Sequence, residues 1–287
     1  MSWRRERYQW RIRGREIALG GRTLVMGVLD VSAWQPRVGG TKAEGEAWLQ
    51  RALDLEAKGA DLIDLTAMGE KLATARISAD DELRRMVPIL RKLRHNIDVP
   101  VSVQTYNAET ANRALELGAE VINDLSGLSF DPQMPETVCR HGAGLILGHA
   151  RGTPDTWRKP AAVAEPLVSV VRDLQSGLAR ARMARIDDRF IAIDPGLGYG
   201  KRRLENYEIL RRLEDLIELR HPVLVSPSRK PFLTESIRAP EADWLYSAAA
   251  AATVAVAGGA HIVRTHEVAE TVSVVRAADR FFEAGGE

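Results

Sequence analysis

The stretch that decides the fold is residues 118–123, Gly-Ala-Glu-Val-Ile-Asn, where a helical pattern stops at Gly-Ala and an apolar strand runs to a polar residue. The same signal, a helical run that ends in Gly-Ala before an apolar strand, recurs at residues 59–64, 142–147 and 259–264. Glycine suits the left-handed cap that ends a helix, and a short apolar strand suits a parallel sheet covered on its outer face. The chain therefore contains a repeated helix-to-strand unit.

Four further strands are predicted at residues 23–31, 99–103, 190–193 and 222–225, which makes eight with the repeats. Helical patterns follow the strands, around residues 41–58, 79–94, 108–117, 131–141, 161–185, 206–219, 243–257 and 267–283. Regular alternation, with no glycine-rich turn after the first strand, favours a closed barrel over an open doubly wound sheet. The predicted fold is an α/β single (β/α)8 TIM barrel at residues 23–287.

The first 22 residues are predicted to form an N-terminal extension. Residues 8–22 are expected to be a short β-hairpin, with Gly20-Gly21 at a turn, which caps the bottom of the barrel. No linker or second domain is indicated by the composition of the remaining chain.

The charge balance points to a small-molecule partner. The chain has 40 Lys and Arg residues and 39 Asp and Glu residues, so its net charge is close to zero and provides no basic field for nucleic acid. No stretch approaches the roughly 20 apolar residues that span a bilayer. We therefore predict no nucleic-acid partner, no membrane insertion and a cytoplasmic location.

Polar residues end the predicted strands, where barrels of this type place their active sites. They are Asp30, Asp64, Gln104, Asn123, Asp124, His149, Asp194, Ser228, Arg229, Lys230, Arg264 and His266. Carboxylates and amides after strands 2, 3, 4 and 6 suit the edge of an amino-pyrimidinone ring, and hydroxyl and cationic donors after strands 7 and 8 suit a phosphate. A flat polar ring joined to a phosphate would satisfy both groups.

The segment at residues 194–201, Asp-Pro-Gly-Leu-Gly-Tyr-Gly-Lys, is not a convincing nucleotide-binding loop. A Walker loop needs glycine where Pro195 stands and Ser or Thr where Arg202 follows the lysine. A flexible glycine loop without function is the alternative interpretation.

Five motifs in order resemble dihydropteroate synthase, from about residue 22 to residue 270. They are Met-Gly-Val-Leu-Asp-Val at 26–31, Ile-Asn-Asp-Leu-Ser-Gly at 122–127, Ile-Asp-Pro-Gly-Leu-Gly-Tyr-Gly-Lys at 193–201, Ser-Arg-Lys at 228–230 and Arg-Thr-His at 264–266. The resemblance implies condensation of 6-hydroxymethyl-7,8-dihydropterin diphosphate with 4-aminobenzoate, with release of diphosphate, magnesium (Mg2+) present, and a homodimer.

The same resemblance assigns roles to individual residues. Asp194 and Asn123 would bind the pyrimidine edge of the pterin, with Asp64 and Gln104 beside them. Lys230 would contact its carbonyl and ring nitrogen. The remaining predicted site residues are Arg264 and His266 at the diphosphate, Ser228 near the aminobenzoate, Lys201 and Arg229 at the substrate, and Asp30 at the metal.

Departures from the family pattern keep other functions open. The loop after the first strand is changed, and the loop at residues 66–76 lacks the family's usual contacts, so Arg37, Lys71 or Arg76 would have to reach the diphosphate. Gly148 stands where a methionine is usual and would leave room beside the ring. The alternatives are a pterin-binding paralogue without synthase activity, a pterin-dependent methyltransferase that serves a corrinoid, and a purely structural interaction protein.

Overall fold

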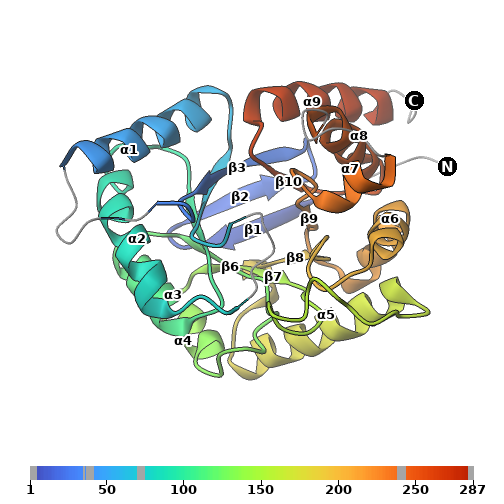
Figure 1. The fold of residues 1–287 in the computed structure, drawn as a ribbon, viewed down its shortest axis with the longest axis horizontal. Helices are drawn as coiled ribbons and strands as arrows, with labels where there is room; N and C mark the ends of the chain where they lie inside the picture. The colour runs from blue at the N-terminus through green and yellow to red at the C-terminus, as the bar shows by residue number, and fades with distance from the viewer. Residues whose placement is uncertain (1–4, 35, 37–41, 70–74, 238–243, 284–287) are drawn as a thin grey trace.

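Eight parallel strands lie at the centre of the described chain, and helices enclose them (Figure 1). The computed structural model describes all residues except 1–4, 35, 37–41, 70–74, 238–243 and 284–287. The strands are β3 (Leu24–Asp30), β4 (Leu62–Thr66), β5 (Val101–Gln104), β6 (Val121–Asp124), β7 (Gly144–Gly148), β8 (Ile191–Asp194), β9 (Leu224–Val225) and β10 (Ile262–Thr265). Nearly every strand residue is buried, because helices cover the outer face and side chains fill the interior.

The strands close into a barrel, in the order β8-β7-β6-β5-β4-β3-β10-β9. Continuous parallel pairing joins the neighbours in this order. The two ends of the order meet through a single parallel bridge between Ile193 and Val223 and a 2.8 Å bond from the Ile193 amide to the Pro222 carbonyl. The predicted (β/α)8 barrel is confirmed, and its seam lies between β8 and β9.

The helices agree with the predicted set, apart from three differences. They are α1 (Lys42–Ala57), α2 (Ala79–Leu93), α3 (Ala108–Glu116), α4 (Met134–His141), α5 (Pro166–Met183), α6 (Arg203–Arg211), α7 (Pro231–Ile237), α8 (Trp244–Ala257) and α9 (Val268–Glu283), with 3₁₀ turns η1 (Asp188–Phe190) and η2 (Leu213–Leu219). The predicted helix at 206–219 is divided between α6 and η2, and α7 was not predicted. The helix predicted from residue 161 begins at Pro166, since proline fits the first turn of a helix.

The recurring Gly-Ala signal ends helices as predicted. Its glycines all have left-handed backbone angles, for example φ +105° at Gly118. A side chain in that conformation would be strained, so glycine there marks the change from helix to strand.

The N-terminal hairpin closes the lower end of the barrel and lies across the middle of the ring in Figure 1. Strands β1 (Tyr8–Ile12) and β2 (Arg15–Leu19) pair antiparallel. The predicted turn at Gly20-Gly21 was wrong: the two-residue loop at 13–14 reverses the chain, and Gly20-Gly21 leads into β3. Fully buried Trp10 packs with strand residues of the barrel and donates to the Phe190 carbonyl at 2.9 Å. The hairpin therefore shares the barrel's core.

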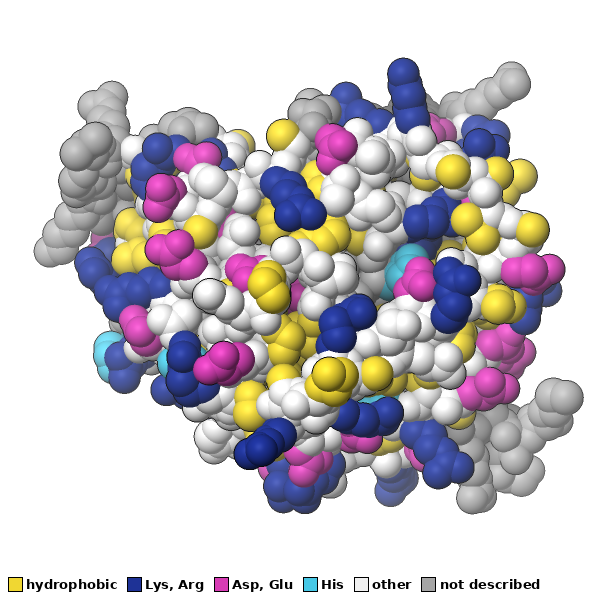
Figure 2. Space-filling view, turned by 90° about the horizontal axis from the view of Figure 1, so that it is seen from below, with side chains coloured by type: hydrophobic (Ala, Val, Ile, Leu, Met, Phe, Trp, Pro, Cys, Tyr) yellow, Lys and Arg dark blue, Asp and Glu magenta, His cyan; other side chains and the backbone are white. Residues whose placement is uncertain are grey.

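Surface charges are mixed in sign where they can be seen. Figure 2 shows cationic and anionic side chains interspersed over one face, with hydrophobic side chains in small groups between them. That face has no continuous basic surface for a nucleic-acid backbone. Among the described residues, no helix combines the length and apolarity needed to cross a membrane.

Candidate functional site

Asp64 is the centre of a hydrogen-bond network inside the carboxyl end of the barrel. Its Oδ1 accepts the Ser102 hydroxyl at 2.6 Å, and its Oδ2 accepts Asn123 Nδ2 at 3.1 Å and Arg264 Nε at 2.7 Å. All four residues are buried, and they come from four different strands. A buried carboxylate is stable only when it is paired and hydrogen-bonded in this way.

Gln104 extends the same network. Its Oε1 accepts the Thr66 hydroxyl at 2.7 Å and Arg264 Nη2 at 3.3 Å, so a neutral amide shares the guanidinium with Asp64. The other amide in the network has spare capacity: Asn123 Oδ1 is buried, without a partner in the described part of the chain. An unsatisfied buried acceptor is costly, and a donor on a ligand would satisfy it.

Asp194 lies at the end of β8 and is 1% exposed. Its Oδ1 accepts the Gly196 amide at 2.7 Å. Burial raises the pKa of this carboxyl, although the charges of Lys230, Lys201 and Arg264 act in the opposite direction. We call Asp64, Gln104, Asn123, Asp194 and Arg264 the floor of the site.

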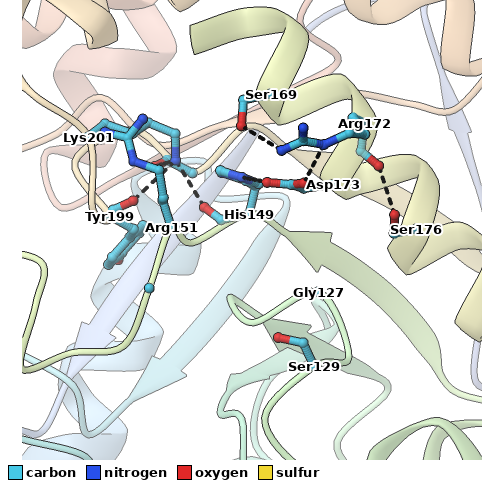
Figure 3. A network of polar contacts seen from close by, with 12 residues as sticks. Gly127, Ser129, His149, Arg151, Ser169, Arg172, Asp173, Ser176, Tyr199 and Lys201 are labelled. Carbon is cyan, nitrogen blue, oxygen red and sulfur yellow. Dashed lines mark hydrogen bonds and ion pairs between the residues drawn. The ribbon is translucent and has the colours of Figure 1, made fainter. Parts of the chain in front are cut away.

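Lys201 fixes the loop that follows Asp194 (Figure 3). Its ammonium donates to the carbonyls of Gly196, His149 and Tyr199 at 2.7, 3.1 and 3.3 Å. Burial lowers the pKa of Lys201 to about 7, and the nearby Asp194 carboxylate opposes that shift. Because three carbonyls occupy its donors, this geometry supports a role in holding the loop more than the predicted substrate contact.

The glycines of that loop allow close backbone contact. Gly196 and Gly200 have φ of +67° and +66°, and a Cβ on them would lie 1.8 Å from the His149 carbonyl oxygen and 1.9 Å from that of Arg151. Any side chain would force the two loops apart. The interpretation as a flexible glycine loop was therefore wrong, and the loop is a close-packed part of the site.

Two polar strand-end residues point away from the floor. The His149 ring is buried against α5, with Nε2 3.1 Å from Asp173 Oδ2, and burial lowers its pKa to about 4 (Figure 3). Asp124 accepts the amides of Ser126 and Leu128 at 2.8 and 2.9 Å and so forms the turn after β6. Both are structural in this arrangement.

Ser228 connects the ends of β9 and β10. Its hydroxyl lies 2.9 Å from His266 Nδ1 and 2.8 Å from Glu267 Oε2, and it accepts the His266 amide at 3.2 Å. The exposed Arg229 pairs with the same Glu267 at 2.7 Å. Arg229 does not line the cavity described next, so its predicted contact with substrate is not supported by this placement.

A cavity of about 660 Å³ opens above the floor. Its inner end is lined by Gln104, Lys230 and Arg264, and beside them Lys230 Nζ lies 4.2 Å from the centre of the Tyr199 ring. Trp157 packs edge-on against Tyr199, with 5.1 Å between the centres of the two rings. The outer end is lined by Arg158, Lys159, Arg202 and Arg203, which we call the basic wall.

Asp30 ends β3, next to β4 and β10. Its Oδ1 accepts the Ser32 amide at 2.8 Å. Within the described residues, no group of three or more His, Cys, Asp or Glu side chains could hold a metal ion. One carboxylate still suits Mg²⁺, which commonly takes one or two carboxylates and completes its shell with water and substrate phosphates.

Of the three cations that were expected to reach the diphosphate in place of the changed loops, only Arg76 lies among the described residues. The guanidinium of Arg76 lies over the Phe130 ring, 4.2 Å from its centre, and the side chain is exposed. Arg37 and Lys71 lie outside the described residues. Nothing here places Arg76 at the floor.

Sequence reasoning missed the basic wall and misjudged Gly148. Arg158 and Lys159 lie in a loop with no recognisable motif, next to a segment that the sequence assigned to a helix. A Cβ on Gly148 would lie 2.8 Å from Leu125 Cα, so the glycine permits close packing of β7 against that turn. The expectation that Gly148 leaves room beside a ring was wrong.

Fold and site together define a pterin-binding (β/α)8 barrel, and a family model described as pterin binding enzyme matches residues 26–266. The chain is 32% identical over 261 residues to dihydropteroate synthase of Synechocystis sp., covering 91% of this chain and 90% of that protein. The chain belongs to the dihydropteroate synthase family, as its motifs predicted.

Solved structures of dihydropteroate synthases support the same family assignment. Dihydropteroate synthase of Yersinia pestis, in complex with a sulfonamide drug, has a TM-score of 0.87 and 30% identity, covering 96% of this chain and 99% of that chain. The enzyme of Xanthomonas albilineans with 4-aminobenzoic acid has a TM-score of 0.86 and 30% identity, covering 96% and 98%.

Proposed function

We propose that this chain condenses 6-hydroxymethyl-7,8-dihydropterin diphosphate with 4-aminobenzoate and releases diphosphate, a step in folate biosynthesis. The observation that carries the proposal is the floor, where Gln104 and Arg264 line a cavity together with Lys230, and the buried Asn123 is linked to Arg264 through Asp64. Relatives named dihydropteroate synthase, in sequence and in structure, match nearly the whole chain.

The floor supplies recognition of the pterin ring. Asn123 Oδ1 and the Asp194 carboxylate would accept hydrogen bonds from the amino-pyrimidinone edge, and Lys230 would donate to its carbonyl and ring nitrogen. Charge-assisted bonds in a water-poor site are strong, so the ring would be held in one orientation.

The reaction itself needs positioning and charge stabilisation more than a protein nucleophile. The bond from the pterin methylene carbon to the diphosphate oxygen breaks, and its electron pair leaves with diphosphate. The nitrogen lone pair of 4-aminobenzoate forms the new C–N bond, and the amine then loses a proton. His266, together with Arg264, would stabilise the departing diphosphate at the end of β10, and Ser228 beside His266 would lie near the aminobenzoate.

We further propose that Asp30 contributes to a magnesium site. A bound Mg²⁺ would supply positive charge for the diphosphate. The Asp30 carboxylate would hold the ion from the end of β3, beside the strand that carries Arg264.

The test measures diphosphate and dihydropteroate in one reaction of pterin diphosphate with magnesium, with and without 4-aminobenzoate. We expect both products only when the acceptor is present. Diphosphate alone would mean that the substrate ionises but no acceptor is used, and neither product would indicate a binding paralogue. Asn123→Ala should lose activity, whereas Arg91→Ala, on the exposed end of α2, should retain it.

We also propose that the chain forms a homodimer through α6, α7 and α8. A largely apolar groove of about 590 Å³ lies there, lined by Tyr207, Leu233, Tyr246 and Val254 among others, and Tyr246 is 74% exposed. Exposed apolar surface of this kind is typical of an interface. Light scattering should give twice the 31.7 kDa chain mass, and Tyr246→Glu should give the monomer.

Finally, we propose that the protein works in the cytoplasm. Its single cysteine, Cys139, is a free thiol, as is usual in a reducing compartment. Fractionation of the native host should recover the chain with cytoplasmic markers; recovery with membranes or outside the cell would contradict the proposal.

A further inference from the structure

The basic wall is a concentration of positive charge that the reaction does not use. Arg158, Lys159, Arg202 and Arg203 are all exposed, and they line the same cavity as Lys230. Within the described chain, no carboxylate forms an ion pair with Lys159, Arg202 or Arg203. Other exposed arginines of this protein do have such partners, for example Arg182 with Asp188.

Another part of the cavity lining has the reverse character. It is formed by Pro231, Phe232 and Glu235 of α7. Proline has no N–H, so the first residue of α7 offers no backbone donor to an anion. Glu235 adds a negative charge, and an acidic ligand would therefore turn its acid toward the basic wall.

The basic wall is built on an ordered frame. Arg202 Nε donates to the Pro160 carbonyl at 3.2 Å, which joins α6 to the loop after β7. Glu205 accepts the amides of Arg202 and Val163 at 2.8 and 3.1 Å and also pairs with Arg151, so this nearby carboxylate is already occupied.

The wall also opposes helix stability. Arg202 and Arg203 are the N-cap and the first residue of α6, where the positive end of the helix dipole disfavours cations. Residues that break a local stability rule are expected where a function requires them. Here the dipole and the cations add to one field that attracts an anion.

We infer that, among arylamine acceptors larger than 4-aminobenzoate, this site favours one whose acidic part extends beyond the ring onto the basic wall and carries more than one carboxylate. The inference rests on the proposed condensation and names its acceptor class. One carboxylate is satisfied by a single guanidinium fork. The two guanidinium groups of Arg202 and Arg203 and the ammonium of Lys159 exceed what the carboxylate of 4-aminobenzoate alone would occupy.

The experiment compares three acceptors with pterin diphosphate and magnesium. They are 4-aminobenzoate, 4-aminobenzoyl-glutamate and 4-aminobenzoyl-glutamine; the last two have the same shape and differ by one carboxylate. We expect kcat/KM for the glutamate acceptor to exceed that for the glutamine acceptor by about fivefold, as one exposed ion pair allows. The ratio should fall as salt is added, because exposed pairs are screened.

Single-charge variants identify the source of the preference. Arg203→Ala should bring the glutamate-to-glutamine ratio close to one, whereas Arg91→Ala, which removes the same charge far along the chain on α2, should leave it as in the wild type. An equal fall in both variants would mean a general charge effect and would overturn the inference.

The remaining outcomes separate this inference from the proposed function. Product from 4-aminobenzoate, together with no product from the glutamate acceptor or a wild-type ratio near one, would overturn the inference alone. Absence of product with every acceptor would overturn the proposed condensation, and the acceptor class with it.

Discussion

The floor and the basic wall are two ends of one cavity, and they are built in opposite ways. On the floor, Asp64 already has three hydrogen-bond donors before any ligand arrives, and it is fully buried. On the wall, Lys159 and Arg203 are exposed and have no ion-pair partner in the described chain. Ring recognition is therefore coupled to the stability of the barrel, whereas acceptor recognition is not.

Breaking the floor should have the largest effect. Asp64→Ala would leave the Arg264 guanidinium buried without its main partner, and we expect the free energy of unfolding to fall by about 3–5 kcal/mol. Urea denaturation measures this change. Asp64→Asn, which keeps the shape and some hydrogen bonds, should lose less; a loss below 1 kcal/mol in the alanine variant would mean that the two regions are equally independent of the fold.

A substitution at Lys230, between the floor and the basic wall, should affect pterin binding instead of folding. Lys230→Ala removes an ammonium that lines the cavity and lies near Asp194. We expect pterin affinity to drop about 100-fold, close to 2.7 kcal/mol, with an unchanged melting temperature. Calorimetric titration with the pterin tests this, and unchanged affinity would remove Lys230 from the site.

Glu82 is as buried as the floor residues but, unlike Asp64, has no ion-pair partner in the described chain. It accepts the Thr105 hydroxyl at 2.7 Å and Asn107 Nδ2 at 2.9 Å, and burial raises its pKa to about 7. A carboxyl whose pKa is higher in the folded state contributes stability below the unfolded pKa near 4.5, and that contribution is lost as pH rises through about 7.

Glu82→Gln should therefore stabilise the protein by roughly 2–3 kcal/mol at pH 8 relative to its effect at pH 5. Denaturation curves at both pH values provide the measurement. If the variant shows the same difference from wild type at both, the raised pKa plays no part in stability.

The smallest effect on stability belongs to the basic wall. Arg203→Ala should change the free energy of unfolding by less than about 0.5 kcal/mol, as expected for an exposed side chain away from special features. A loss above 1 kcal/mol would show that the wall supports the fold and would remove the contrast with the floor.

The fold could be predicted from sequence because its signals are local. Each Gly-Ala junction combines a helix cap with an apolar strand, and that pattern needs no tertiary information. The strand-end positions of Asp64, Asn123 and Arg264 followed from it, since barrels bring these ends together. Gln104 and Asp194 end strands that were predicted without that signal, and all five floor residues were predicted to lie at one rim of the barrel.

The directions of side chains could not be predicted in the same way. His149 ends a strand like Asp194, yet its ring turns outward to α5 because Asp173 lies there. Lys201 belongs to a motif, yet its ammonium is used by three carbonyls. Such outcomes depend on partners distant in sequence, and the same is true of the cations in the loop after β7.

The single bridge between Ile193 and Val223 makes the barrel a ring with one weak joint. Asp194 stands on one side of that joint, and Lys230 follows the short strand on the other. We expect local opening at this joint to expose the buried floor to solvent. The amide hydrogen of Ile193 should therefore exchange with solvent faster than that of Ile122 in β6. A pterin bound to both Asp194 and Lys230 would link the two sides of the joint and slow the exchange of the Ile193 amide. Equal exchange rates with and without the ligand would mean that the joint stays closed.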